Sequence, residues 1–198
     1  MHILKGGGQL VQKCNSSKIM INKSNNFAYI DGANLHRGVK DLGWKLDYKK
    51  FRVWIREKYG VERAYIFLGY LPFYTNLYRD LQTWGYTIVF KPTILNGDGE
   101  VKGNCDAEMV LQAVSDMYEN EYEKAVVVTG DGDFACLVKF LQDKERFLTL
   151  ISPNHKRASV LLRNAVVQNI VFLNQFKVRL EFQKATQKEK AHVTRRNS

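Results

Sequence analysis

The chain has few cysteines and no long apolar segment. Its three cysteines, Cys14, Cys105 and Cys136, are odd in number and far apart, which excludes a disulfide framework and the usual spacing of a zinc site. No run approaches the ~20 consecutive apolar residues of a membrane span. Residues 1–20 also lack the apolar core of a secretory signal. We therefore expect a protein of the reducing cytoplasm.

Several motifs of nucleotide chemistry are also missing. No GxGxxG follows an apolar strand, and no GxxxxGK[ST] loop exists, so dinucleotide and P-loop sites are excluded. An aspartyl phosphatase would need a second acid two residues after Asp31, where the chain has Ala33. The four histidines show no metal-ligand spacing: His2, His36, His155 and His192.

The basic excess lies at the two ends of the chain. Of the net charge of +10, residues 1–26 carry +4 and residues 177–198 carry +5, whereas residues 27–176 are nearly neutral. Such ends can hold a polyanion without reading its sequence; solvated tails that aid solubility are an equally good interpretation. We expect a basic N-terminal arm (1–26), one folded domain (27–176) and a basic C-terminal tail (177–198).

The middle of the chain alternates apolar and amphipathic segments. Strands are expected at 27–31, 63–70, 86–92, 125–128, 147–152 and 169–174, and helices at 46–60, 74–85, 105–118, 133–145 and 157–165. Continuous apolar strands that alternate with helices are typical of a mostly parallel sheet covered on both faces. The fold class is therefore α/β, a three-layer sandwich with a mostly parallel central sheet and helices on both faces.

Two helices allow more detailed predictions. Asp47 is a suitable N-cap and Gly60 a suitable stop for the helix between them. In the helix over 105–118, one apolar face is expected to pack inward, and Asp116 on the opposite side to be solvated. That face comprises Ala107, Val110, Leu111, Val114 and Tyr118.

Four aspartates fall where sites form in parallel α/β sheets. Asp31 ends the first strand, Asp131 and Asp133 follow the strand at 125–128, and Asp106 lies in the first turn of the preceding helix. Each of them alone can be a turn residue or a helix cap. If the strands of Asp31 and Asp131 are neighbours, however, the four converge at the carboxyl edge of the sheet. Clustered carboxylates are the ligands of a hard cation such as Mg²⁺ or Mn²⁺.

Three stretches resemble the NYN domain family, and more closely its bacterial LabA-like branch. These are YIDGANL (29–35), KGNCDAEMVLQA (102–113) and VVTGDGDFACLVKFL (127–141). The resemblance covers roughly residues 27–175. The family is similar to PIN-domain nucleases, and the resemblance implies a Rossmann-like PIN/NYN sandwich, an acidic pocket that binds Mg²⁺ or Mn²⁺, and cleavage of RNA. The motif acids correspond to Asp31, Asp106, Asp131 and Asp133, and Asn34 and Thr129 match polar positions beside them; many relatives carry serine at the latter.

The resemblance leads to a divalent-metal-dependent ribonuclease acting on single-stranded RNA. All four aspartates would serve as catalytic and metal-binding residues, and Asn34 and Thr129 would orient them. Lys102 and Arg37, expected on loops beside the motifs, would meet the RNA backbone unless they are simply solvated surface charges. Because relatives often pair, we also expect that a homodimer can form.

Two other functions remain open at this stage. One is a non-catalytic RNA-binding or regulatory module, in which the acids hold only a structural cation. The other is an interaction protein that assembles through an aromatic-rich surface, although helical spacing favours burial of most of these rings. The aromatic residues concerned are Trp44, Trp54, Phe73, Tyr74, Tyr78 and Trp84.

Overall fold

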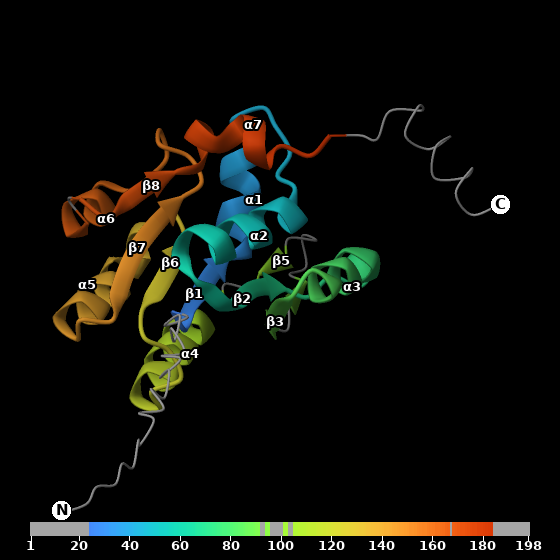
Figure 1. The fold of residues 1–198 in the computed structure, drawn as a ribbon. Helices are drawn as coiled ribbons and strands as arrows, with labels where there is room; N and C mark the ends of the chain where they lie inside the picture. Colours follow the sequence, from blue (N-terminus) through green and yellow to red (C-terminus); the bar gives the residue numbers. More distant parts are fainter. Residues whose placement is uncertain (1–23, 92–93, 96–100, 103–104, 167, 184–198) are drawn as a thin grey trace, which may run out of the picture.

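A six-stranded, fully parallel sheet forms the middle layer of the structure, a computed structural model (Figure 1). The strand order is β3-β2-β1-β6-β7-β8. The structure describes residues 24–91, 94–95, 101–102, 105–166 and 168–183. The strands of the sheet are β1 (Asn26–Asp31), β2 (Val61–Gly69), β3 (Tyr86–Lys91), β6 (Ala125–Val128), β7 (Phe147–Ser152) and β8 (Ile170–Phe172). The short strands β4 (Ile94–Leu95) and β5 (Val101–Lys102) pair separately as an antiparallel ribbon.

Helices cover both faces of the sheet. One face carries α1 (Gly32–Lys40), α2 (Tyr48–Tyr59), α3 (Thr75–Thr83) and α7 (Lys177–Leu180). The other face carries α4 (Asp106–Tyr118), α5 (Ala135–Asp143) and α6 (Val160–Ala165). Single-turn 3₁₀ segments add η1 (Pro72–Tyr74), η2 (Gly132–Phe134) and η3 (Leu173–Phe176). The expected α/β three-layer class is confirmed. Among the described residues, no helix is both long and apolar enough to span a bilayer.

The strand order reverses between β1 and β6, which lie side by side. They pair in parallel from Phe27 opposite Ala125 to Ile30 opposite Val128. From β1 the chain builds β2 and β3 on one side, then crosses back to build β6, β7 and β8 on the other. Ligand sites of such sheets form at this switch point, beyond the carboxyl ends of the strands. The condition on which the four aspartates would converge is therefore met.

Alternate residues of the central strand enter two different cores. Ala28 and Ile30 pack with α1 and α2, whereas Phe27 and Tyr29 pack with α4 and α5. The second core is rich in rings; Tyr29, for example, stacks on Tyr65 with centroids 5.6 Å apart. Both faces of β1 are thus fully buried, which explains why its sequence shows no polar alternation.

The expected caps of α2 are confirmed. The Asp47 side chain accepts a hydrogen bond from the Lys50 backbone N–H at 3.0 Å, and Gly60 ends the helix in the left-handed region with φ of 63°. Only glycine adopts that conformation at little cost.

The packing face predicted for α4 is wrong. Leu111 and Tyr118 are 68% and 65% exposed, whereas Asp116, expected in solvent, is only 4% exposed. The residues that α4 buries are Met109, Ala113, Asp116 and Met117. Apolar residues lie on more than one side of this helix, so spacing alone does not select a face. The hydroxyl of Tyr29 determines which face of α4 is buried, because a buried phenol needs a hydrogen-bond partner. This hydroxyl donates to the Asp116 carboxylate at 2.7 Å.

Two segments expected to be irregular are helical. Residues 32–40 form α1, which begins directly after Asp31. At the other end, the expected tail from residue 177 starts inside the fold: α7 buries Leu180 completely, and the Leu180 carbonyl accepts a hydrogen bond from the Asp47 backbone N–H. Residues 1–23 and 184–198 lie outside the described part of the chain.

The aromatic residues that were expected to be mostly buried divide between core and surface. Trp44, Trp54 and Tyr78 are buried, but Phe73 is 77% exposed and Tyr74 is 49% exposed.

Replacing Tyr29 by Phe should destabilise the protein. Among the described residues, the change leaves the buried Asp116 carboxylate with the Gln112 amide, 2.7 Å away, as its one remaining side-chain hydrogen-bond donor. We expect the free energy of unfolding to fall by about 1–3 kcal/mol, measured by urea denaturation. Tyr118→Phe, on the exposed side of α4, is the matched control and should have no effect. Equal midpoints for Tyr29→Phe and the unmodified protein would contradict this interpretation of Asp116.

Candidate acidic site at the switch point

Three carboxylates from two segments meet at the carboxyl edge of the sheet. Asp106 begins α4, Asp131 precedes η2, and Asp133 lies within η2. One oxygen of each lies within 4.8 Å of the corresponding oxygens of the other two. All three stand at helix starts, where the positive end of the helix dipole favours negative charge. The structure thus brings together three of the four predicted aspartates in one compact group.

Asp31 lies beside this group at the end of β1 and is partly buried. Its Oδ1 accepts a hydrogen bond from the Asn34 backbone N–H at 2.9 Å, so it caps α1. Its Oδ2 accepts another from the Thr129 hydroxyl at 3.2 Å. Burial raises the pKa of the Asp31 carboxyl, these two hydrogen bonds lower it, and the charges of Asp106 and Asp131 raise it further. Asp31 therefore shares the electrostatic environment of the other acids.

The side chains of Thr129 and Asn34 connect β1 and α1 to the acidic turn. Besides donating to Asp31, the fully buried Thr129 hydroxyl accepts a hydrogen bond from the Asp131 backbone N–H at 3.1 Å. The Asn34 side-chain oxygen accepts one from the Gly130 backbone N–H at 2.8 Å. Both residues thus hold the turn that carries Asp131 and Asp133 against the end of β1.

Two glycines allow the close approaches that the site needs. A Cβ on Gly32 would lie 2.4 Å from Leu68 Cδ2 and 2.9 Å from the Phe67 carbonyl oxygen, so α1 can begin directly against β2 only without a side chain there. A Cβ on Gly132 would lie 2.5 Å from the Ser159 hydroxyl. These contacts explain why a glycine directly follows Asp31 and why another glycine separates Asp131 from Asp133.

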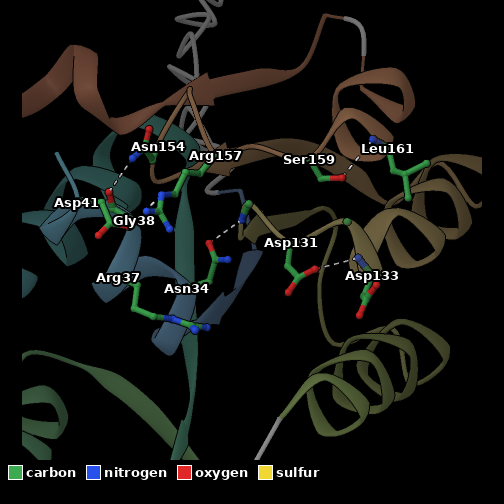
Figure 2. A pocket seen from close by; sticks show the side chains of 12 residues that line it. Asn34, Arg37, Gly38, Asp41, Asp131, Asp133, Asn154, Arg157, Ser159 and Leu161 are labelled. Carbon is green, nitrogen blue, oxygen red and sulfur yellow. Dashed lines mark hydrogen bonds and ion pairs between the residues drawn. The ribbon is translucent and has the colours of Figure 1, made fainter.

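An open cleft of about 510 Å³ adjoins the acids (Figure 2). Its walls are α1, the acidic turn, and the loop that follows β7. Arg37 lines it, but from α1 and not from the loop that the sequence suggested. Lys102 falls in β5, and its side chain lies outside the described part of the structure.

Sequence reasoning missed four polar residues that line this cleft. Asn154, Arg157 and Ser159 come from the loop after β7, and Asp41 follows α1. The rule that sites form after parallel strands would have flagged Asn154, two residues beyond the end of β7. Nothing in the sequence marks Arg157 or Asp41.

The carboxylate group fits a hard divalent cation. Two ligands of one Mg²⁺, each at about 2.1 Å, are at most about 4.2 Å apart. The 4.8 Å spread of the three oxygens needs only a small side-chain adjustment to meet that limit. An all-carboxylate donor set also suits Mg²⁺ or Mn²⁺ better than metals that prefer thiolate or imidazole. Glu108, on the same helix as Asp106, is not part of this group: its Oε1 lies 3.2 Å from Lys91 Nζ in an ion pair.

The fold and the acidic edge together define a parallel α/β domain with a cluster of carboxylates at the switch point of its sheet. The family model described as NYN domain matches residues 27–174, so the chain belongs to the NYN domain family, as the sequence motifs predicted.

Two similar proteins agree with this assignment. The low amplitude and bright protein LabA of Synechococcus elongatus is 29% identical over 146 residues, which cover 69% of this chain and 77% of LabA, and supports the LabA-like branch. A solved structure of a protein of unknown function from Vibrio parahaemolyticus has a TM-score of 0.64 and 21% identity. It covers 81% of this chain and 98% of its own, and shows the same fold.

The Thr129 hydroxyl should contribute measurably to stability. Thr129→Val keeps the shape but leaves the Asp131 backbone N–H and the Asp31 carboxylate each without one partner. We expect the free energy of unfolding to fall by about 1–3 kcal/mol, measured by urea denaturation. Thr129→Ser keeps the hydroxyl and should lower the free energy of unfolding clearly less than Thr129→Val does. Equal losses in both variants would show that the methyl group, and not the hydrogen bonds, matters at this position.

Proposed function

We propose that this chain is a divalent-metal-dependent endoribonuclease that hydrolyses phosphodiester bonds of single-stranded RNA. The observation that carries the proposal is the group of Asp106, Asp131 and Asp133 at the switch point, with Asp31 beside it. This group occurs in a domain whose family is PIN-like nucleases. All four motif aspartates are present, so the acidic donor set of the family is complete.

The roles of the residues follow from their positions. Asp106, Asp131 and Asp133 would hold Mg²⁺ or Mn²⁺, which supplies positive charge to the phosphate and activates water for attack. Asp31 adds negative charge behind them and, through Thr129, fixes the turn that carries two of the ligands. Asn34 holds the Gly130 backbone from the α1 side, and Arg37 offers its guanidinium to an RNA phosphate. The protein would thus contribute to the reaction mainly by positioning the cation and the RNA and by the charges that it places around them.

Affinity for RNA would come largely from charge. The folded middle of the chain is nearly neutral, and the excess of +4 and +5 lies in residues 1–26 and 177–198. Contacts of this kind bind the phosphate backbone irrespective of base sequence and weaken steeply with salt. A single strand fits the proposal best, because the cleft beside the acids is open and of small-molecule size.

One observation favours a second candidate, a non-catalytic RNA-binding module. Asp31 caps α1 and Asp131 caps η2 through hydrogen bonds to backbone N–H groups. These roles would keep both aspartates useful even without a metal-dependent reaction.

Replacement of Asp131 by Asn separates the two candidates. Asn keeps an oxygen that can cap η2 but removes one charge from the group. We expect Mn²⁺-dependent cleavage of single-stranded RNA to fall by about two orders of magnitude or more, because a metal ligand is weakened. The melting temperature without metal should hold or rise, since like charges are relieved, and the rise on adding Mn²⁺ should shrink.

The measurements are a gel-based cleavage assay and melting curves with and without Mn²⁺. Asp80→Asn, an exposed acid on α3, is the matched control and should resemble the unmodified protein in both. An Asp131→Asn variant that cleaves normally and melts earlier would sink the nuclease assignment and support the cap interpretation.

A further inference from the structure

The loop after β7 is tied at both ends to the elements that form the acidic site. The Asn154 side-chain amide, only 5% exposed, donates to the Gly38 carbonyl at 3.3 Å, and Pro153 packs so closely on Gly38 that an added Cβ would lie 2.6 Å away. At the other end, the Ser159 backbone N–H donates to the Gly130 carbonyl at 3.0 Å. The loop is therefore held in register with both α1 and the turn that carries Asp131.

Two arginines face the cleft from the side opposite the acids. Figure 2 shows Arg37 and Arg157 on the α1 side of the cleft, Asp131 and Asp133 on the other side, and Asn34 between them. The Nε of Arg37 donates to the Ala33 carbonyl at 3.4 Å, a contact within its own helix. Among the described residues, no carboxylate forms an ion pair with Arg37.

Arg157 forms an ion pair through its Nε. Its Nε lies 3.1 Å from Asp41 Oδ2, and the Arg157 side chain is 71% exposed. A guanidinium carries five N–H donors in a planar fork that suits phosphate oxygens. An anion in the cleft can therefore contact the terminal amino groups of Arg157, or displace the exposed and weakly held Asp41.

We propose that this cleft binds the RNA phosphate adjacent to the scissile one, with Arg157 and Arg37 as its phosphate-binding residues and Asp41 as a competing internal anion. The proposal rests on the proposed function and specifies how the strand lies in the site. The carboxylates would hold the cation that neutralises charge on the scissile phosphate. A neighbouring phosphate needs positive charge from the protein itself, which the two arginines supply across the cleft.

Competition between Asp41 and RNA for Arg157 predicts opposite effects of the two substitutions on RNA affinity. If Asp41 competes with RNA for Arg157, its removal should tighten RNA binding, whereas removal of Arg157 should weaken it. If instead the Arg157–Asp41 pair only tethers the loop to α1, removing either partner should have the same effect.

The test measures equilibrium binding of a short fluorescently labelled oligouridylate by anisotropy at several salt concentrations. All variants are made in the full-length Asp131→Asn protein, so that the strand stays intact. We expect Arg157→Ala to weaken binding about tenfold, the equivalent of one lost charge-assisted hydrogen-bonded contact. It should also reduce the slope of log affinity against log salt by about 0.7, as one phosphate contact is lost. Asp41→Asn should tighten binding. Arg56→Ala, an exposed arginine near the C-terminal end of α2, is the matched control and should leave affinity unchanged.

A second readout uses the protein with Asp131 intact. Arg157→Ala should raise KM for RNA cleavage about tenfold while kcat changes much less, because the contact is the same in ground and transition states. An unchanged affinity and salt slope for Arg157→Ala, or equal weakening by Arg157→Ala and Asp41→Asn, would overturn the proposed subsite. Absence of cleavage by the unmodified protein would instead overturn the nuclease assignment, and the binding experiment would still decide on the cleft.

Discussion

The parallel pairing of β1 with β6 is the constraint on which the rest of the site depends. It places the end of one strand, Asp31, beside the end of another, Thr129, although 98 positions separate them in the chain. The Thr129 hydroxyl then joins the two ends by donating to Asp31 and accepting from the Asp131 backbone. Because both strands are buried, this edge of the sheet provides a packed base for the turn that carries Asp131 and Asp133.

The acidic group balances opposing electrostatic effects. Asp31 shows these effects together. Burial and the charges of Asp106 and Asp131 raise the pKa of its carboxyl, whereas its hydrogen bonds from the Asn34 backbone N–H and the Thr129 hydroxyl lower it. A divalent cation would relieve the repulsion between these carboxylates. The same caps would hold the acids in place before any cation arrives.

The fold alone does not specify a reaction. The Vibrio parahaemolyticus structure shares the architecture at 21% identity, and such a likeness carries the fold and no more. Function depends on which side chains stand at the switch point and in the adjoining cleft. Here the loop after β7 matters, because Ser159 and Asn154 tie it to the acidic turn and to α1 and so place Arg157 opposite the acids.

The sequence by itself determined the elements whose signals are local. Buried strands, the Asp47 and Gly60 caps and the acids after strand ends could all be predicted, because each depends on residues within a few positions. Tertiary structure alone decided which face of α4 is buried, since the Asp116 carboxylate is drawn into the core by the hydroxyl of a strand residue 87 positions away. It also decided that Arg157 shares a cleft with Asp131. Contacts between distant segments leave no periodic trace in the sequence, and only the packed sheet brings them together.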